Sequence, residues 1–133
     1  MYLVDTNVWL ERLLEQQKSE EVSRFLDRTP SESLFITDFA FHSIAIALSR
    51  LRAFGAFLQF VNDAFIDGCV GFIGLVPRDT EHLVSVMNHL KLDFDDAYQY
   101  VAAEKHGLTI VSFDGDFDRT ELGRKTPADV LKG

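Results

Sequence analysis

Short apolar runs alternate along the chain with longer segments in which apolar and polar residues repeat at helical spacing. Four of the apolar runs predict buried strands: Tyr2–Val4, Leu34–Ile36, Val70–Val76 and Leu108–Val111. Between and after them we expect helices after Asn7, over Ser19–Leu26, Phe39–Leu51, Phe54–Phe65 and Thr80–Leu90, from Asp93–Asp96 to Gly107, and after Pro127. This alternation predicts an α/β fold with a doubly wound, mainly parallel central sheet of about four or five short strands and helices on both faces.

Composition places this pattern in a single globular domain. The chain has 133 residues, 47% apolar and 26% charged, which is typical of one domain spanning residues 1–133. No apolar run approaches the roughly 18 residues of a membrane span, so no membrane partner is expected. Cys69 is the only cysteine, which excludes an internal disulfide and favours a reducing, cytoplasmic location.

The charge balance limits how the chain can bind nucleic acid. Its 13 Lys and Arg face 21 Asp and Glu, a formal net charge of −8. Proteins that hold nucleic acid by electrostatics alone are basic, because neutralising phosphate drives that binding. Acids also crowd the segment from Asp93 to Asp118, where Lys105 is the only Lys or Arg. A nucleic-acid substrate would therefore require a bound cation here.

Three aspartates lie where a parallel sheet binds its ligands. Asp5 follows the first predicted strand, Asp114 follows the last, and Asp96 begins the helix that leads back into that last strand. Carboxylates that meet at one edge repel one another, and a bound Mg²⁺ or Mn²⁺ would remove the conflict. Such an ion would polarise a phosphodiester and lower the pKa of a bound water.

Capping and turn formation are the competing explanation for each aspartate taken alone, because Asp is common at both places. We expect Asp95 to cap its helix and Asp93 to be an exposed loop charge. The coincidence of acids at the ends of two strands is more specific than any one of them.

Four motifs then occur in order along almost the whole chain: Val4–Asn7, Asp96–Ala97 followed by Ala102–Ala103, Ser112–Phe117 and Thr126–Pro127. Together they resemble the PIN-domain family, named after the PilT N-terminus, and within it the VapC-type toxin ribonucleases of prokaryotic toxin–antitoxin pairs. The resemblance implies a PIN-like fold, a Mg²⁺ or Mn²⁺ cofactor, endonucleolytic cleavage of RNA and a small antitoxin partner.

The resemblance also implies roles for individual residues. It implies three catalytic, metal-binding acids: Asp5, Asp96 and Asp114. It implies an auxiliary metal-site acid at Asp116, and polar residues that support the pocket at Thr6, Asn7 and Ser112.

One position departs from the family pattern. PIN proteins usually carry a Glu on the helix after the second strand, where this chain has His42 or Ser43. Asp38 lies one turn before His42 and could substitute, although a helix cap is the favoured role for it. His42 could offer a nitrogen ligand, but a hydrogen bond to a loop is favoured. A non-catalytic module that only binds a partner protein is therefore one alternative, and a DNA-directed nuclease is another.

Bulky apolar residues crowd one predicted helix and the residue that follows it: Phe54, Phe57, Phe60, Phe65 and Ile66. Core packing is the default explanation, but a single stripe of one helix cannot bury all of them. We expect the excess to form a homodimer face or a groove for an antitoxin peptide.

Overall fold

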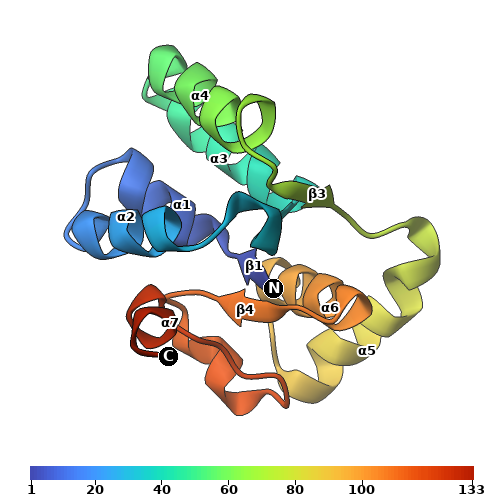
Figure 1. The fold of residues 1–133 in the computed structure, drawn as a ribbon. Coiled ribbons are helices and arrows are strands. Elements are labelled where there is room, and N and C mark those ends of the chain that lie inside the picture. The colour runs from blue at the N-terminus through green and yellow to red at the C-terminus, as the bar shows by residue number, and fades with distance from the viewer.

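A four-stranded, all-parallel sheet forms the centre of the computed structural model, which describes all 133 residues (Figure 1). The strand order is β3-β2-β1-β4, and the strands are β1 (Tyr2–Val4), β2 (Leu34–Thr37), β3 (Gly71–Ile73) and β4 (Thr109–Val111). Leu3 of β1 pairs with Phe35 on one side and with Ile110 on the other. The predicted α/β fold with a parallel sheet of short strands is confirmed.

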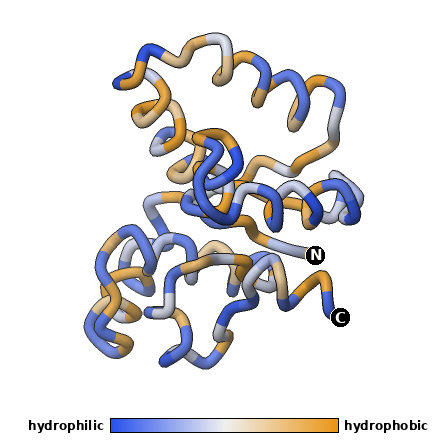
Figure 2. Tube along the Cα trace, turned by 90° about the vertical axis from the view of Figure 1, so that its left-hand side faces the viewer, coloured by the Kyte–Doolittle hydropathy of each residue, from blue (hydrophilic) through white to orange (hydrophobic).

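Seven α-helices surround the sheet: α1 (Thr6–Leu13), α2 (Ser19–Arg28), α3 (Asp38–Arg50), α4 (Phe54–Val61), α5 (Thr80–Leu90), α6 (Phe94–His106) and α7 (Pro127–Lys132). Short helical turns join them: η1 (Ser31–Ser33), η2 (Asn62–Ile66), η3 (Pro77–Asp79) and η4 (Gly115–Arg119). The trace in Figure 2 alternates between hydrophobic and hydrophilic colours along the helical turns, as expected for amphipathic helices. None of the helices combines the length and apolar character that crossing a membrane requires.

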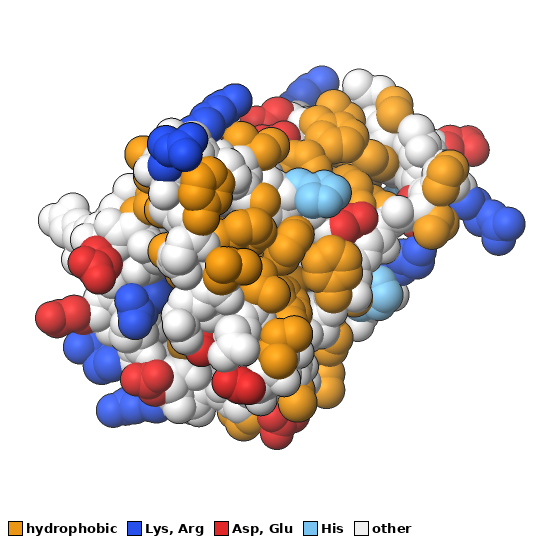
Figure 3. Space-filling view, turned by 90° about the horizontal axis from the view of Figure 1, so that it is seen from above, with side chains coloured by type: hydrophobic (Ala, Val, Ile, Leu, Met, Phe, Trp, Pro, Cys, Tyr) orange, Lys and Arg blue, Asp and Glu red, His pale blue; other side chains and the backbone are white.

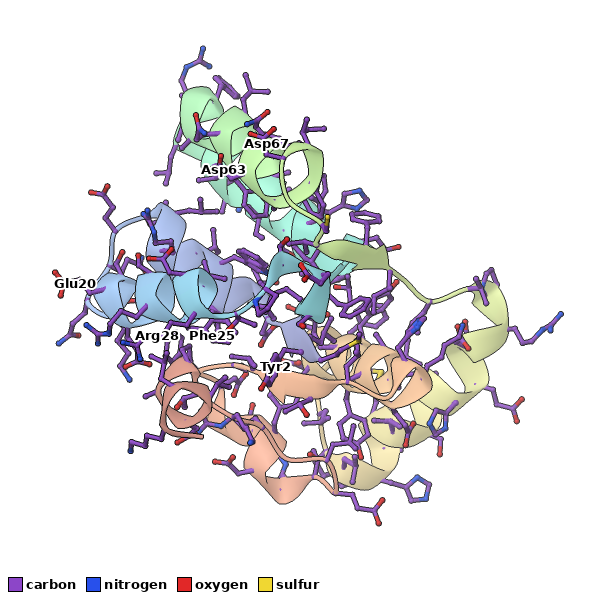
Figure 4. The ribbon with its side chains drawn as sticks, viewed as in Figure 1. Tyr2, Glu20, Phe25, Arg28, Asp63 and Asp67 are labelled. Carbon is purple, nitrogen blue, oxygen red and sulfur yellow. The ribbon has the colours of Figure 1, made fainter.

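Two hydrophobic cores lie on opposite faces of the sheet because side chains alternate along a strand. Leu3 belongs to the core under α5 and α6, whereas Val4 belongs to the core under α1, α2, α3 and α4. Phe25 of α2 is fully buried in the core that contains Val4, and its ring packs edge to face against that of Tyr2 at a centroid distance of 6.2 Å (Figure 4). Because helices cover both faces of the sheet, its carboxyl edge is the place that remains open for a site.

Helix starts gather at that edge. Asp5 caps α1, Thr37 caps α3, Asp93 caps α6 and Asp114 caps η4, each by accepting a hydrogen bond from a backbone N–H. The expectation that Asp95 caps α6 and that Asp93 is a loop charge is wrong, because Asp93 has the extended backbone of an N-cap.

Two further local expectations are corrected. Thr37, not Asp38, caps α3, since its hydroxyl accepts from the N–H of Ala40. Strand β3 is shorter than the predicted Val70–Val76, because its partner β2 ends at Thr37, which pairs with Ile73. After the strand the chain passes close to Asp38: a Cβ at Gly74 would stand 2.6 Å from the Asp38 carboxylate and would displace it.

Candidate metal centre and active site

Asp5 anchors the site at the end of β1, where it is 7% exposed. Its Oδ1 accepts hydrogen bonds from the backbone N–H of Thr6 (2.9 Å) and from Nε2 of Gln99 (2.9 Å). Its Oδ2 accepts one from the hydroxyl of Ser112 (2.7 Å). Burial raises the pKa of Asp5, and these three donors oppose that rise by stabilising the ionised form. Thr6 therefore contributes its backbone N–H to the pocket.

Ser112 connects Asp5 to the segment that carries Asp114. While its hydroxyl donates to Asp5, its oxygen accepts from Nδ2 of Asn7 (3.3 Å) and from the backbone N–H of Asp114 (2.9 Å). Asn7 in turn accepts from the backbone N–H of Phe113 (3.2 Å). The structure thus brings Asn7 and Ser112 beside Asp5, where they tie the ends of β1 and β4 together.

Three carboxylates converge beside this network. Asp96, Asp114 and Asp116 each offer an oxygen, and the three oxygens all lie within 4.8 Å of one another. Asp96 comes from the first turn of α6, whereas Asp114 and Asp116 come from the start of η4 after β4. Asp5 stands outside this closest group, but its charge still acts on Asp96. The structure therefore brings together acids that are far apart in the sequence.

The electrostatics of the group reflect this crowding. Burial raises the pKa of Asp96 to about 8, with the hydrogen-bonded carboxyl and charge of Asp114 acting in the same direction. The charges of Asp93 and Asp5 add smaller effects of the same sign. In the absence of a cation, burial and the neighbouring carboxylates therefore favour the protonated form of Asp96 at neutral pH.

Two arginines hold the η4 segment in place. Arg119 pairs with the exposed carboxylate of Asp116 (3.2 Å) and also donates from Nε to the carbonyl of Leu90 (3.1 Å). Arg124 donates from Nε and Nη2 to both oxygens of Asp118 (3.0 and 3.1 Å) and from Nη1 to the carbonyl of Ser112 (3.1 Å).

The three residues around the departure from the family pattern lie on α3. Asp38 accepts hydrogen bonds from the N–H of Phe39 (2.8 Å) and from the hydroxyl of Tyr98 (2.7 Å). His42 is exposed and Ser43 is half-buried. None of the three belongs to the closest group of acids.

Sequence reasoning missed Gln99 and Thr37. Gln99 is 2% exposed and bonds both to Asp5 and to the hydroxyl of Thr37 (2.6 Å). One signal was present in the sequence, since Gln99 lies three residues after Asp96 and therefore on the same helix face.

The donor set suits a hard divalent cation. All the converging ligand atoms are carboxylate oxygens, which Mg²⁺ and Mn²⁺ prefer over the nitrogen and sulfur ligands of softer metals. The neighbouring carboxylates contribute to the raised pKa of Asp96, as expected where no cation provides compensation for their negative charge. A cation held by Asp96, Asp114 and Asp116, with Asp5 beside them, would supply that compensation.

A model of the PIN domain matches residues 2–122 of the chain. No curated protein matches the chain in sequence.

Solved structures with the same fold include several bacterial proteins. The "Toxin-antitoxin complex from Klebsiella pneumoniae" aligns with a TM-score of 0.76 at 17% identity, covering 96% of this chain and 98% of that one. The Mycobacterium tuberculosis toxin VapC20, described as cleaving the sarcin–ricin loop, aligns with a TM-score of 0.74 at 18% identity, covering 89% and 93%. FitAcB from Neisseria gonorrhoeae aligns with a TM-score of 0.74 at 21% identity, covering 96% and 99%.

Proposed function

The chain belongs to the PIN-domain family, and we propose that it is a cytoplasmic, divalent-cation-dependent endoribonuclease that serves as the toxin of a toxin–antitoxin pair. The observation that carries the proposal is the convergence of Asp96, Asp114 and Asp116 at the carboxyl edge of the sheet. An otherwise acidic chain needs a cation there to bring a phosphodiester close. The toxin descriptions of its structural neighbours support the biological role.

The protein side chains would hold and orient the reacting groups. Asp96, Asp114 and Asp116 would bind Mg²⁺ or Mn²⁺, and Asp5 would face the same ion from the end of β1. When bound, the ion supplies Lewis-acid polarisation of the phosphodiester and activates water for hydrolysis. Ser112 fixes the relative placement of two of these acids, because it bonds both the Asp5 carboxylate and the Asp114 backbone.

The test combines metal binding with cleavage. We expect calorimetric Mn²⁺ binding and EDTA-sensitive RNA cleavage by the wild type, and loss of both in Asp114→Asn. Asparagine keeps the shape and the capping oxygen of residue 114, so the fold should persist. Asp95→Asn is the matched control, since Asp95 is exposed and lies next to Asp96.

Each alternative function has its own outcome in this test. A wild-type protein that neither binds Mn²⁺ nor cleaves nucleic acid would refute the nuclease and support a non-catalytic binding module. Cleavage of single-stranded DNA but not of RNA would replace the substrate class while keeping the metal site.

We assign the antitoxin to a groove between α1, α2 and the α4–η2 segment. The groove has a volume of about 520 Å³, and Trp9, Leu26 and Phe60 contribute to its apolar wall. Three acids, Glu15, Asp27 and Asp63, line it against one base, Arg12. Apolar walls with acidic rims fit an amphipathic helix that carries basic side chains. Figure 4 shows Asp63 on the α4–η2 side of the molecule.

Charge reversal tests this assignment with the purified protein encoded beside this chain as the probe. Asp27→Lys with Asp63→Lys should weaken its binding at least about tenfold, because two favourable charge contacts become repulsive. Asp67→Lys is the control. Asp67, like Asp63, is an exposed η2-region acid held by an amide side chain, but it lies outside the groove. Equal affinities in both variants would place the antitoxin elsewhere.

We assign a second copy of the chain to an apolar face over α3, α4, η2 and β3, which Figure 3 shows from above. Its exposed members are Ile46, Leu51, Phe54, Leu58, Ile66 and Phe72. Phe72 and Phe65 pack edge to face at 6.1 Å, so the face is continuous with the aromatic core. A stable dimer covers about 800 Å² on each partner, and exposed apolar side chains gathered on one face suit that role.

A further inference from the structure

Gln99 is a buried polar residue that touches the site without belonging to the acid cluster. It lies on α6 one turn after Asp96 and is 2% exposed. Its Nε2 donates to Oδ1 of Asp5 at 2.9 Å, and its Oε1 accepts from the hydroxyl of Thr37 at 2.6 Å. The side chain therefore bridges the end of β2 to the end of β1.

Thr37 fixes the direction of this amide. Its hydroxyl oxygen accepts the N–H of Ala40 at 2.9 Å, as the N-cap of α3. The single hydroxyl proton donates to Gln99, which presents its carbonyl oxygen to Thr37. The amide NH₂ is thereby turned toward Asp5. A flipped amide would set its oxygen against an oxygen of the Asp5 carboxylate and would deprive the Thr37 hydroxyl proton of its acceptor, so only one orientation keeps both hydrogen bonds.

We propose that Gln99, oriented by Thr37, is a positioning residue that sets which oxygen of Asp5 faces the metal site. The backbone N–H of Thr6 and Gln99 occupy Oδ1 of Asp5, and Ser112 occupies one lone pair of Oδ2. A carboxylate has about four acceptor directions, so one remains, and it is on Oδ2. The inference rests on the proposed metal-dependent function.

If Gln99 had only a structural role, its removal would lower the stability of the fold without lowering metal affinity. The two hydrogen bonds join Gln99 to Thr37, 62 residues away in the sequence, and to Asp5, 94 residues away. Such contacts stabilise the fold whether or not a cation binds. Metal affinity must therefore be measured separately from stability. Removal of outer residues that orient metal ligands typically weakens metal binding about 10- to 100-fold.

The experiment compares four full-length variants by Mn²⁺ calorimetry, thermal unfolding in EDTA, and steady-state RNA cleavage. Gln99→Met keeps the length of the side chain and removes both hydrogen bonds. Thr37→Val removes the orienting hydroxyl, and Thr37→Ser is the conservative control that retains it. The double variant Thr37→Val with Gln99→Met leaves no orphaned partner between these two positions. Both Thr37→Val variants also lose the cap of α3 at the Ala40 N–H, and unfolding in EDTA measures that loss separately from metal binding.

We expect Gln99→Met, Thr37→Val and the double variant to bind Mn²⁺ about 10- to 100-fold more weakly. Their kcat should fall while KM for RNA stays within about twofold, because the residues do not contact substrate. Thr37→Ser should match the wild type. Folded variants with wild-type Mn²⁺ affinity and kcat would overturn the positioning role and leave the proposed nuclease intact. A wild type that binds no Mn²⁺ would overturn both.

Discussion

Replacing Asp96 by Asn should make the protein more stable without metal and inactive with it. Asp96 is 8% exposed and its pKa is raised by burial and by Asp114 to about 8, from an ordinary value of 3.8. The unfolded chain loses this proton near pH 4, whereas the folded protein keeps it up to about pH 8. The contribution of Asp96 to stability is therefore fully present below pH 4 and is lost as the pH rises toward 8. Asparagine is neutral throughout and avoids that loss.

The size of the effect follows from the pKa. A rise from 3.8 to about 8 corresponds to roughly 6 kcal/mol of unfolding free energy at alkaline pH. Contact of the carboxyl group with water reduces this value, and we expect about half of it. For a chain of this length, about 3 kcal/mol raises Tm by roughly 10 °C. At pH 5 the difference should shrink to less than about 1 kcal/mol.

Thermal unfolding in EDTA at pH 5 and pH 9 measures this difference directly. Adding Mn²⁺ at pH 9 should raise the Tm of the wild type and leave that of Asp96→Asn unchanged, because a cation that binds only the folded state stabilises it. Asp95→Asn should follow the wild type under all conditions, since Asp95 is exposed. If the Tm of Asp96→Asn and of the wild type fell in parallel between pH 5 and pH 9, the electrostatic argument would be refuted.

Three other changes test separate parts of the structure. Arg124→Ala removes the bonds to Asp118 and to the carbonyl of Ser112, so Mn²⁺ affinity measured by calorimetry should fall several-fold; unchanged affinity would show that η4 holds its shape without the arginine. Phe25→Ala empties a fully buried site and should lower the unfolding free energy in urea by about 3–5 kcal/mol, whereas a loss below about 1 kcal/mol would contradict the packing. Leu58→Glu places a charge on a side chain that is 70% exposed on the apolar face, and light scattering should then show a monomer where the wild type is a dimer; a wild type that is already monomeric at micromolar concentration counts against the dimer.

The sheet and the place of the site could be predicted from sequence because both depend on short-range pattern. Apolar runs followed by Asp5 and by Asp114 marked the carboxyl ends of neighbouring parallel strands, and the structure pairs Leu3 with Ile110 in the same sheet. Helical spacing likewise predicted most helix positions, including the stop at Gly107, which has a φ of 65°. Local chemistry was sufficient for these features.

Helix caps could not be assigned in the same way. Around α6 and α3 the sequence offers several adjacent capping residues, and the choice falls on the one whose backbone is extended. That conformation is set by how the helix packs on the sheet, which pattern alone does not show. The hydrogen bonds of Gln99 could not be predicted from local pattern either, because their partners Asp5 and Thr37 are distant in the sequence.

The distribution of buried polar groups ties the fold to its function. Six polar or charged residues are buried: Asp5, Thr37, Asp96, Gln99, Ser112 and Thr120. Only Thr120 lies apart, and it bonds the nearby carbonyl of Phe117. The others surround one edge of the sheet, where two buried aspartates have raised pKa values. A chain under selection for stability alone would place apolar residues at such positions, since burying like charges destabilises the fold. Their concentration at a single edge is best explained by a ligand of opposite charge that the folded protein is built to receive.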